Sequence, residues 1–211
     1  IIFIMFTKDE KKKDIGGIFL GFAILMYGME AMSGAVAPLA DNEKFTGILT
    51  MFSNPILGLL AGTILTAVIQ SSSASVGILQ ALCATGAVNF STALPIIMGQ
   101  NIGTCVTAII SSIGTSKNAK RAAAVHLFFN ISGTVIFMVV FYTLNTFVHF
   151  SFLNTAASPA GIAVIHSLFN IGATILLFPF ANLLEKMAIL AIPDKGSEVE
   201  EMEEEKINPD L

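Results

Sequence analysis

The stretch PILGLLAGTILTAVIQSSSASVGILQALCATGAV, residues 55–88, decides the fold of this chain. It is apolar on both sides of a polar centre, the sequence QSSS at residues 70–73. A membrane crossing takes roughly 20 helical residues, so this stretch is too short for two crossings and a turn. It predicts a re-entrant helical hairpin with a helix from Pro55 to about Ile69, a break, and a second helix to about Val88. Two full spans would give the same topology, and the length favours the hairpin.

The composition of the whole chain points to a membrane protein. Of its 211 residues, 54% are hydrophobic and 12% are charged, whereas an average soluble domain has roughly 25% charged residues. No Asp, Glu, Lys or Arg occurs from Phe45 to Ser116 or from Ala122 to Leu184. A charge at the centre of a membrane span costs about 2.5 to 3.5 kcal/mol, so such uncharged stretches favour lipid. We therefore expect an all-α integral membrane protein. Outside the hairpin, four segments are long enough to cross the bilayer: Ile15–Leu39, Leu94–Ile113, Ala122–Leu144 and Gly161–Leu184.

The charged residues between these segments predict a topology. Residues 1–7 are interpreted as the end of a preceding helix, and residues 8–14, KDEKKKD, as a basic cytoplasmic loop. A second basic loop, SKNAKR at 116–121, is also expected in the cytoplasm, because loops rich in Lys and Arg stay there. The acidic tail at 193–211 is then cytoplasmic as well, a solvated linker. Residues 15–192 form the transmembrane part.

Several function classes are excluded by charge and by cysteine spacing. The net charge of −4 leaves no basic surface for nucleic acid. Cys83 and Cys105 lie in apolar segments and form neither a CxxC pair nor a Cys/His ligand spacing, so no transition-metal site is expected. No cofactor is expected either.

The polar centre of the hairpin is the first candidate site. A break at Gln70 would expose the free N–H groups of the second helix, and that positive helix end attracts anions. Hydroxyl groups of Ser71, Ser72 and Ser73 add hydrogen-bond donors. Because no Lys or Arg lies nearby in the sequence, an anion would depend on these groups and on accompanying cations. The alternative is that the serines only join helices to each other.

The second candidate is the sequence GQNIGTCVT at residues 99–107. Pro95, Gly99 and Gly103 are expected to weaken this helix. Unwound carbonyls, together with Asn and Thr oxygens, suit a hard cation such as Na⁺. The alternative is a glycine-rich packing face.

Five further polar residues are candidates for coupling or gating. Glu30 is an isolated acid in a membrane span, which makes it a functional candidate, although it could lie at the interface. His126 and Asn130 recur as His166 and Asn170 in two similar sequences, HLFFNISGT and HSLFNIGAT. Such groups are often satisfied core residues, and an ion or proton role is the alternative.

These motifs resemble one family. LTAVIQSSSASVGILQAL at 65–82 and PIIMGQNIGTCVTAIISSIG at 95–114 are similar to the sodium-dependent phosphate cotransporter (Na/Pi symporter) family. GMEAMSGAVAPL at 28–39, FSNPILGLLAG at 52–62, KNAKRAAAVHLFFN at 117–130 and HSLFNIGATILLFPF at 166–180 extend the resemblance. Family members carry two inverted repeats, each with a QSSS hairpin, and this chain resembles the second repeat of a bacterial member.

The resemblance implies specific roles. Gln70, Ser71, Ser72 and Ser73 would bind phosphate, and sodium would bind at Thr66, Gln70, Ser73, Asn101 and Thr104. It also implies an N-terminal repeat of the same protein as partner and, after the acidic tail, a possible cytoplasmic domain similar to the phosphate regulator PhoU.

The function expected from all of this is sodium-coupled symport of inorganic phosphate across the bacterial inner membrane by alternating access. This chain would supply the second half of the transport site. Two alternatives remain open: a symporter for another oxyanion, and a regulatory or structural membrane subunit of a phosphate-sensing system. An intramembrane serine enzyme is not expected, because no base lies near the serines.

Overall fold

The computed structural model describes residues 2–193, so the predicted acidic tail from Asp194 onward lies outside the described residues. Its helices are α1 (Ile2–Phe6), α2 (Glu10–Val36), α3 (Glu43–Met51), α4 (Pro55–Ile69), α5 (Ser72–Ala84), α6 (Phe90–Ser111), α7 (Lys117–Val148), α8 (Pro159–Leu177) and α9 (Ala181–Ala191). Short 3-10 turns cover Ala37–Asp41, Ser151–Asn154 and Phe178–Phe180. Residues 2–193 contain no strand. The expected all-α class is confirmed, and four helical segments are long and apolar enough to cross a membrane.

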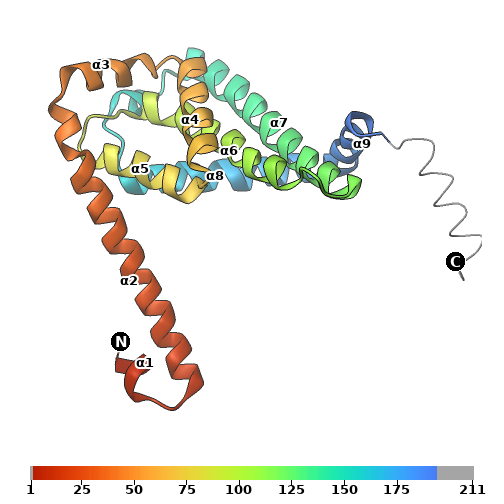
Figure 1. Cartoon of the computed structure of the whole chain (residues 1–211). Coiled ribbons are helices and arrows are strands. Elements are labelled where there is room, and N and C mark those ends of the chain that lie inside the picture. The colour runs from red at the N-terminus through yellow and green to blue at the C-terminus, as the bar shows by residue number, and fades with distance from the viewer. Residues whose placement is uncertain (1, 194–211) are drawn as a thin grey trace, which may run out of the picture.

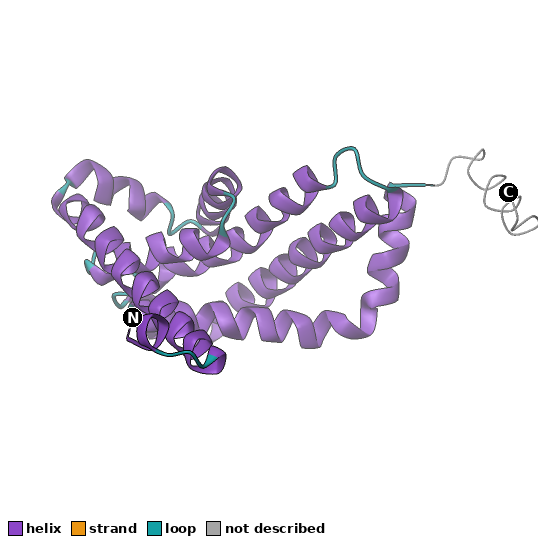
Figure 2. Cartoon of the chain, turned by 60° about the horizontal axis from the view of Figure 1, so that its bottom comes forward, coloured by secondary structure: helices purple, strands orange, loops and turns teal. Residues whose placement is uncertain are grey.

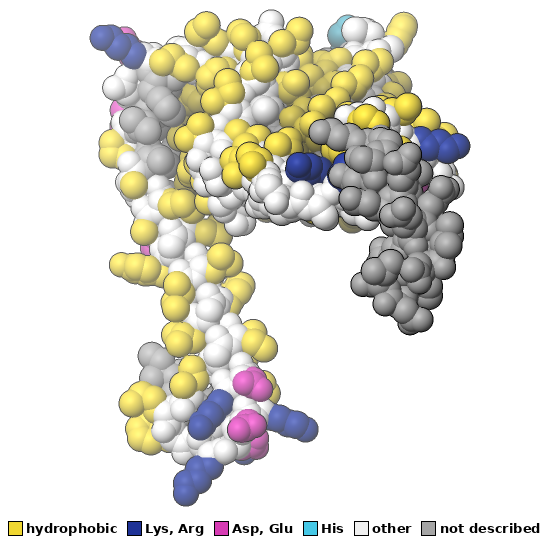
Figure 3. Space-filling view, turned by 45° about the vertical axis from the view of Figure 1, so that its right-hand side comes forward, with side chains coloured by type: hydrophobic (Ala, Val, Ile, Leu, Met, Phe, Trp, Pro, Cys, Tyr) yellow, Lys and Arg dark blue, Asp and Glu magenta, His cyan; other side chains and the backbone are white. Residues whose placement is uncertain are grey.

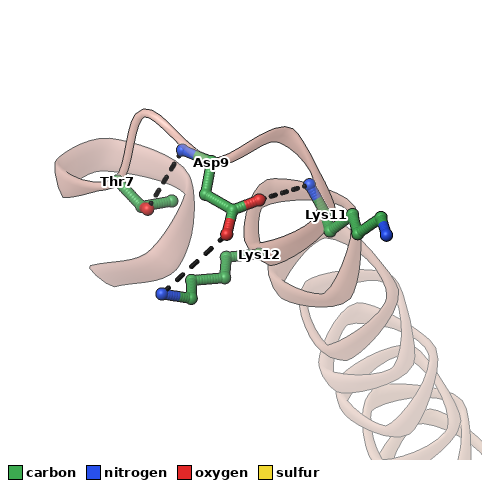
Figure 4. A network of polar contacts seen from close by, with 4 residues as sticks. All are labelled: Thr7, Asp9, Lys11 and Lys12. Carbon is green, nitrogen blue, oxygen red and sulfur yellow. Dashed lines mark hydrogen bonds and ion pairs between the residues drawn. The ribbon is translucent and has the colours of Figure 1, made fainter.

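Helix α2 is a long arm that leaves the body of the molecule, and α1 lies beside its far end (Figure 1). Asp9 caps the start of α2, because its Oδ1 accepts a hydrogen bond of 3.1 Å from the Lys11 N–H (Figure 4). Its Oδ2 also lies 3.9 Å from Lys12 Nζ, in an ion pair. Charged side chains gather at this far end, whereas hydrophobic side chains cover much of the arm above it (Figure 3). An apolar exposed surface of this kind fits lipid or protein contact rather than water.

Helix α6 is the centre of the body. Every residue from Thr92 to Asn101 is buried. One apolar cluster packs Ile97 of α6 against Leu79 of α5 and Ile162 of α8. A second cluster packs Leu94 and Met98 of α6 against Phe169 of α8 and aromatic residues of α7. The hairpin α4–α5 is thus attached to a well-packed scaffold.

Helices α4 and α6 pack backbone against backbone. A Cβ added to Gly62 would lie 2.1 Å from the Ile96 carbonyl oxygen, and one added to Gly99 would lie 2.0 Å from the Leu59 carbonyl oxygen. No side chain fits there, which is the general reason for small residues at membrane helix interfaces. The predicted unwinding at Gly99 and Gly103 is wrong: α6 is helical throughout Phe90–Ser111. These glycines permit close packing, as the alternative interpretation held.

The base of the hairpin is joined to the loop between α7 and α8. The segment after α5 reverses at Gly86, whose φ is +78°. It then forms an antiparallel bridge between Asn89 and Ala156. The Ala157 N–H donates to the Val88 carbonyl at 2.8 Å, and the Phe90 N–H donates to the Thr155 carbonyl at 3.1 Å. Two loops far apart in the sequence are therefore held together.

Helix ends account for most differences from the sequence prediction. Helix α5 ends at Ala84 instead of Val88, because the chain turns at Thr85 and Gly86. The segment predicted as Leu94–Ile113 begins earlier, at Phe90, and ends at Ser111. The predicted span Gly161–Leu184 is interrupted at Phe178–Phe180, where Pro179 cannot continue the hydrogen bonding of α8. Helix α9 turns sharply away from α8 at this point (Figure 2).

Both basic segments are also more helical than expected. The predicted loop 116–121 is the first turn of α7, because the Ser116 hydroxyl caps the helix by accepting from the Ala119 N–H at 3.3 Å. The predicted span Ala122–Leu144 is therefore longer at both ends. Helix α2 similarly begins inside the predicted loop 8–14, at Glu10, and ends at Val36 rather than Leu39. Helix α3 was not predicted.

Candidate functional site

The break of the hairpin lies at Gln70 and Ser71. Helix α4 ends at Ile69 as expected, and Gln70 has φ 58° and ψ 23°, the left-handed conformation that is uncommon for residues other than glycine. The Gln70 N–H donates to the Thr66 carbonyl at 2.7 Å, which closes the last turn of α4. Ser71 is extended and caps α5, because its hydroxyl accepts from the Ala74 N–H at 3.3 Å. Two helix ends of opposite polarity therefore meet at one point.

The amino-terminal end of α5 offers hydrogen-bond donors. The first N–H groups of a helix have no partner within it. Ser71 satisfies one of those in α5, because its hydroxyl accepts from the Ala74 N–H. The Ser75 N–H already makes the first regular helical bond, to the Ser71 carbonyl. The N–H groups of Ser72 and Ser73 are among those that remain. The side chains of Gln70 and Ser73 are exposed, and those of Ser71 and Ser72 are half-buried. This end has the chemistry of an anion site.

A buried polar network lies directly behind the break. The Thr66 hydroxyl donates to Ser75 Oγ at 2.8 Å. Gln100 Nε2 of α6 donates to Ser75 Oγ at 2.9 Å and to the Ser75 carbonyl at 3.0 Å. Thr66, Ser75 and Gln100 are each at most 1% exposed. The network joins the end of α4, the start of α5 and the middle of α6.

Asn101 and Thr104 of α6 donate side-chain hydrogens within the helix. Asn101 Nδ2 donates to the Ile97 carbonyl at 2.9 Å, and the Thr104 hydroxyl donates to the Gln100 carbonyl at 2.8 Å. Their oxygen lone pairs are therefore directed elsewhere. Oxygens without competing donors are the ligands that a hard cation prefers.

Glu30, one of the coupling candidates, lies away from the break. Glu30 of α2 is exposed and lines a hollow of about 520 Å³ with Asp41 and Thr85, near the carboxyl end of α5. Because α5 spans Ser72–Ala84 and rises about 1.5 Å per residue, Glu30 lies at the opposite end of that helix from the serines. The structure does not bring it to the site.

The two His/Asn pairs share one local geometry. Asn130 Nδ2 donates to the His126 carbonyl at 3.0 Å, and Asn170 Nδ2 donates to the His166 carbonyl at 2.8 Å. The first pair contacts α6 through a weak hydrogen bond of 3.6 Å from Cys105 Sγ to the His126 carbonyl. The sequence similarity of the two segments thus corresponds to a repeated side-chain bond on α7 and α8.

Gln100 and Ser75 were not among the predicted binding residues. Both belong to the polar runs singled out from the sequence. Their importance comes from a contact between residues 25 positions apart, which no local spacing reveals.

The fold and the site together define an integral membrane protein with a broken helical hairpin, and discontinuous helices of this kind build the binding sites of many transporters. The sequence profile of the family described as Na⁺/Pi-cotransporter matches residues 24–159. The chain belongs to this family, as the sequence motifs suggested.

Three relatives illustrate the range of the family. YqeW of Bacillus subtilis is 31% identical over 185 residues, which cover 87% of this chain and 59% of that protein. The "Putative inorganic phosphate export protein YjbB" of Salmonella typhimurium is 24% identical, over 92% of this chain and 36% of that protein. The sodium-dependent phosphate transport protein 2A of Rattus norvegicus is 39% identical over 113 residues, covering 51% of this chain and 17% of that protein. This chain therefore spans only part of each relative. No solved structure matches it.

Proposed function

We propose that this chain supplies one half of the transport site of a sodium-coupled inorganic phosphate symporter in the bacterial cytoplasmic membrane. The observation that carries the proposal is the break at Gln70 and Ser71, where the carboxyl end of α4 meets the amino end of α5. A helix amino end favours an anion and a carboxyl end favours a cation. The break therefore suits a phosphate and a sodium ion bound side by side.

The binding roles follow from the donors and acceptors of the site. The N–H groups at the start of α5, with the side chains of residues 70–73, bind phosphate. The side-chain oxygens of Thr66, Gln70, Ser73, Asn101 and Thr104 bind sodium. Sodium offsets part of the phosphate charge, which matters because this part of the sequence, from Phe45 to Ser116, contains no Lys or Arg.

Transport proceeds by alternating access in this proposal. A ligand shifts a protein toward the conformation that binds it more tightly, so joint binding of phosphate and sodium favours closure of the site. An N-terminal repeat of the same protein supplies the second hairpin. Residues 8–14 and 116–121 and the acidic tail lie on the cytoplasmic side, and a PhoU-like domain follows the tail.

The direction of transport is a second question. A relative named for phosphate export supports export as the alternative to import. The same site serves both, because the direction of a coupled carrier depends on the gradients of phosphate and sodium.

The test is uptake of radiolabelled phosphate into proteoliposomes that contain the full-length parent protein. An inward Na⁺ gradient is compared with a matched K⁺ gradient, for wild type and for Ser72→Ala. We expect Na⁺-dependent uptake in wild type and its loss in Ser72→Ala. Uptake that is equally negligible under both gradients, from folded wild-type protein, would reject phosphate symport. Uptake of sulfate in place of phosphate would support another oxyanion.

A further inference from the structure

A hollow of about 420 Å³ lies where α6 ends, α7 begins and α9 ends. This volume is within the range of roughly 300 to 1,000 Å³ that is usual for ligand pockets. Lys120 of α7 lines the hollow, and no residue of the proposed transport site does. The rest of the wall is mostly apolar and comes from three segments of the chain: Ile109 and Ile113 around the end of α6, Ala123, Ala124 and Leu127 of α7, and Ile192 after α9.

Hydrogen bonds between distant segments hold this hollow in shape. Arg121 Nε and Nη2 both donate to the Ile192 carbonyl, at 3.0 and 2.9 Å. The segment after α9 is thereby fixed to the start of α7, where α9 packs (Figure 1). On the other side, the chain leaves α6 through a turn in which Gly114 has a φ of +77°. The hollow is therefore a built feature of this end of the molecule.

Lys120 gives the hollow a positive edge. Its side chain is half-buried, and within residues 2–193 its ammonium group makes neither a hydrogen bond nor an ion pair. Lys117 and Arg121 belong to the same first turns of α7. No Asp or Glu occurs from Phe45 to Leu184, so helices α4 to α8 offer these cations no carboxylate. An anionic group, such as a phosphate, suits this edge.

The apolar wall runs from Lys120 into the membrane-spanning part of α7. This helix is long and apolar enough to cross a membrane, and the chain carries no charge from Ala122 to Leu184. Leu127 lies on the same face as Lys120, two turns and about 10 Å further along the helix. A ligand that matches the whole hollow therefore has an anionic head and a hydrocarbon tail.

We propose that this hollow binds an anionic phospholipid, with the headgroup phosphate at the Lys120 ammonium group and an acyl chain against the apolar wall. Basic pockets between membrane helices bind the headgroups of anionic lipids. The acidic run EVEEMEEEK at 198–206 is another anionic candidate. Its carboxylates match the charge of Lys120, but they do not suit the apolar wall, because burial of a charge against apolar groups is unfavourable.

The bound lipid contacts all three segments that form the hollow, so it stabilises this end of the fold. A ligand that binds only the folded protein raises the unfolding temperature as its concentration increases. Binding of lipid is therefore measurable without transport, and the result does not depend on which ions or anions the protein carries.

The experiment compares two lipids with the same acyl chains and different headgroup charge. The unfolding temperature of the full-length protein in detergent is recorded as dioleoyl phosphatidylglycerol or dioleoyl phosphatidylcholine is added to the micelles. We expect phosphatidylglycerol, the anionic lipid, to stabilise wild type at the lower concentration. Lys120→Gln should raise the phosphatidylglycerol concentration at half-effect about fivefold, the contribution of one basic residue near anionic lipid. The matched control is Lys186→Gln, which should leave it unchanged, because Lys186 is an exposed lysine of α9 that does not line the hollow.

A second variant tests the hollow itself. Ala124→Phe retains every charge but places a ring in the space for the acyl chain, so it should also raise the half-effect concentration. A value within twofold of wild type for Lys120→Gln or for Ala124→Phe overturns the proposal, and either variant alone is decisive if the other does not fold.

Two further outcomes would assign the hollow to a different occupant. If wild type responds equally to both lipids, and a preference for phosphatidylglycerol appears only when the glutamates of 198–205 are replaced by glutamine, the acidic tail occupies the hollow and the lipid proposal fails. If soluble glycerol phosphate stabilises wild type as phosphatidylglycerol does, and Lys120→Gln removes that effect, the site binds a small anion and the lipid proposal also fails.

Discussion

Replacing Gly99 with alanine is expected to disrupt the transport site from a distance. The added Cβ would lie 2.0 Å from the Leu59 carbonyl oxygen, whereas ordinary contact begins at 3.4 Å. The two backbones therefore have to separate by about 1.4 Å, and backbone atoms cannot move aside as a flexible side chain does. Overpacking of this kind costs about 1 to 3 kcal/mol.

The separation also acts on the site itself. Helix α4 carries Thr66 and α6 carries Gln100, and both bond to Ser75 at 2.8 to 3.0 Å. A shift of more than 1 Å takes at least one of these bonds beyond hydrogen-bond distance. We therefore expect Gly99→Ala to lower phosphate uptake at least tenfold, together with a lower unfolding temperature.

The assay pairs proteoliposome uptake with thermal unfolding of the same preparations. Gly133→Ala is the matched control, because its Cβ would meet side chains and no backbone: Ala173 at 3.3 Å and Leu177 at 3.6 Å, at the contact between α7 and α8. That variant should keep most of its uptake. Gly99→Ala with wild-type uptake and wild-type unfolding temperature would refute the reasoning about backbone contact.

Four further substitutions separate stability from function. Glycine suits the left-handed backbone of residue 70, at φ 58°, so Gln70→Gly should unfold at or above the temperature of wild type. Because the side chain is lost, we expect reduced uptake. Unchanged uptake would exclude the Gln70 side chain from the site. Ser71→Ala and Ser158→Ala each remove a helix-capping hydroxyl, so each should lower the free energy of unfolding by about 1 kcal/mol. Only Ser71→Ala should raise the phosphate concentration needed for half-maximal uptake. Equal uptake by both variants would contradict this. Gly86→Ala places a side chain at φ +78° and should lower the free energy of unfolding by about 1 kcal/mol, while uptake persists. An unchanged unfolding temperature would show that the backbone at residue 86 is not strained by a side chain.

The parts of the fold that depend on local chemistry could be predicted from the sequence. Asn54 and Pro55 begin α4, since the Asn54 side chain caps it and proline suits a first helical position. The polar run after Ile69 ends it. The four long apolar segments were recognisable because lipid imposes their length and composition.

The parts that depend on packing between distant segments could not be predicted. Gly99 and Gly103 weaken an isolated helix, and only the presence of α4 beside them shows that they serve close contact. The pairing of Gln100 with Ser75 likewise requires the hairpin to be folded back along α6. Residues 117–121 were predicted as a loop from their charges, but they are helical because the Ser116 hydroxyl caps the start of α7.

The two attachments of the hairpin limit how it can move. Its first helix touches α6 through backbone atoms at Gly62 and Gly99, and its base is pinned by the bridge between Asn89 and Ala156. A hairpin held along its length and at its root cannot swing like a flap on its own. A rearrangement that moves the hairpin therefore has to carry α6 and the segment 155–157 with it, or break the contacts at Gly62, Gly99 and Asn89.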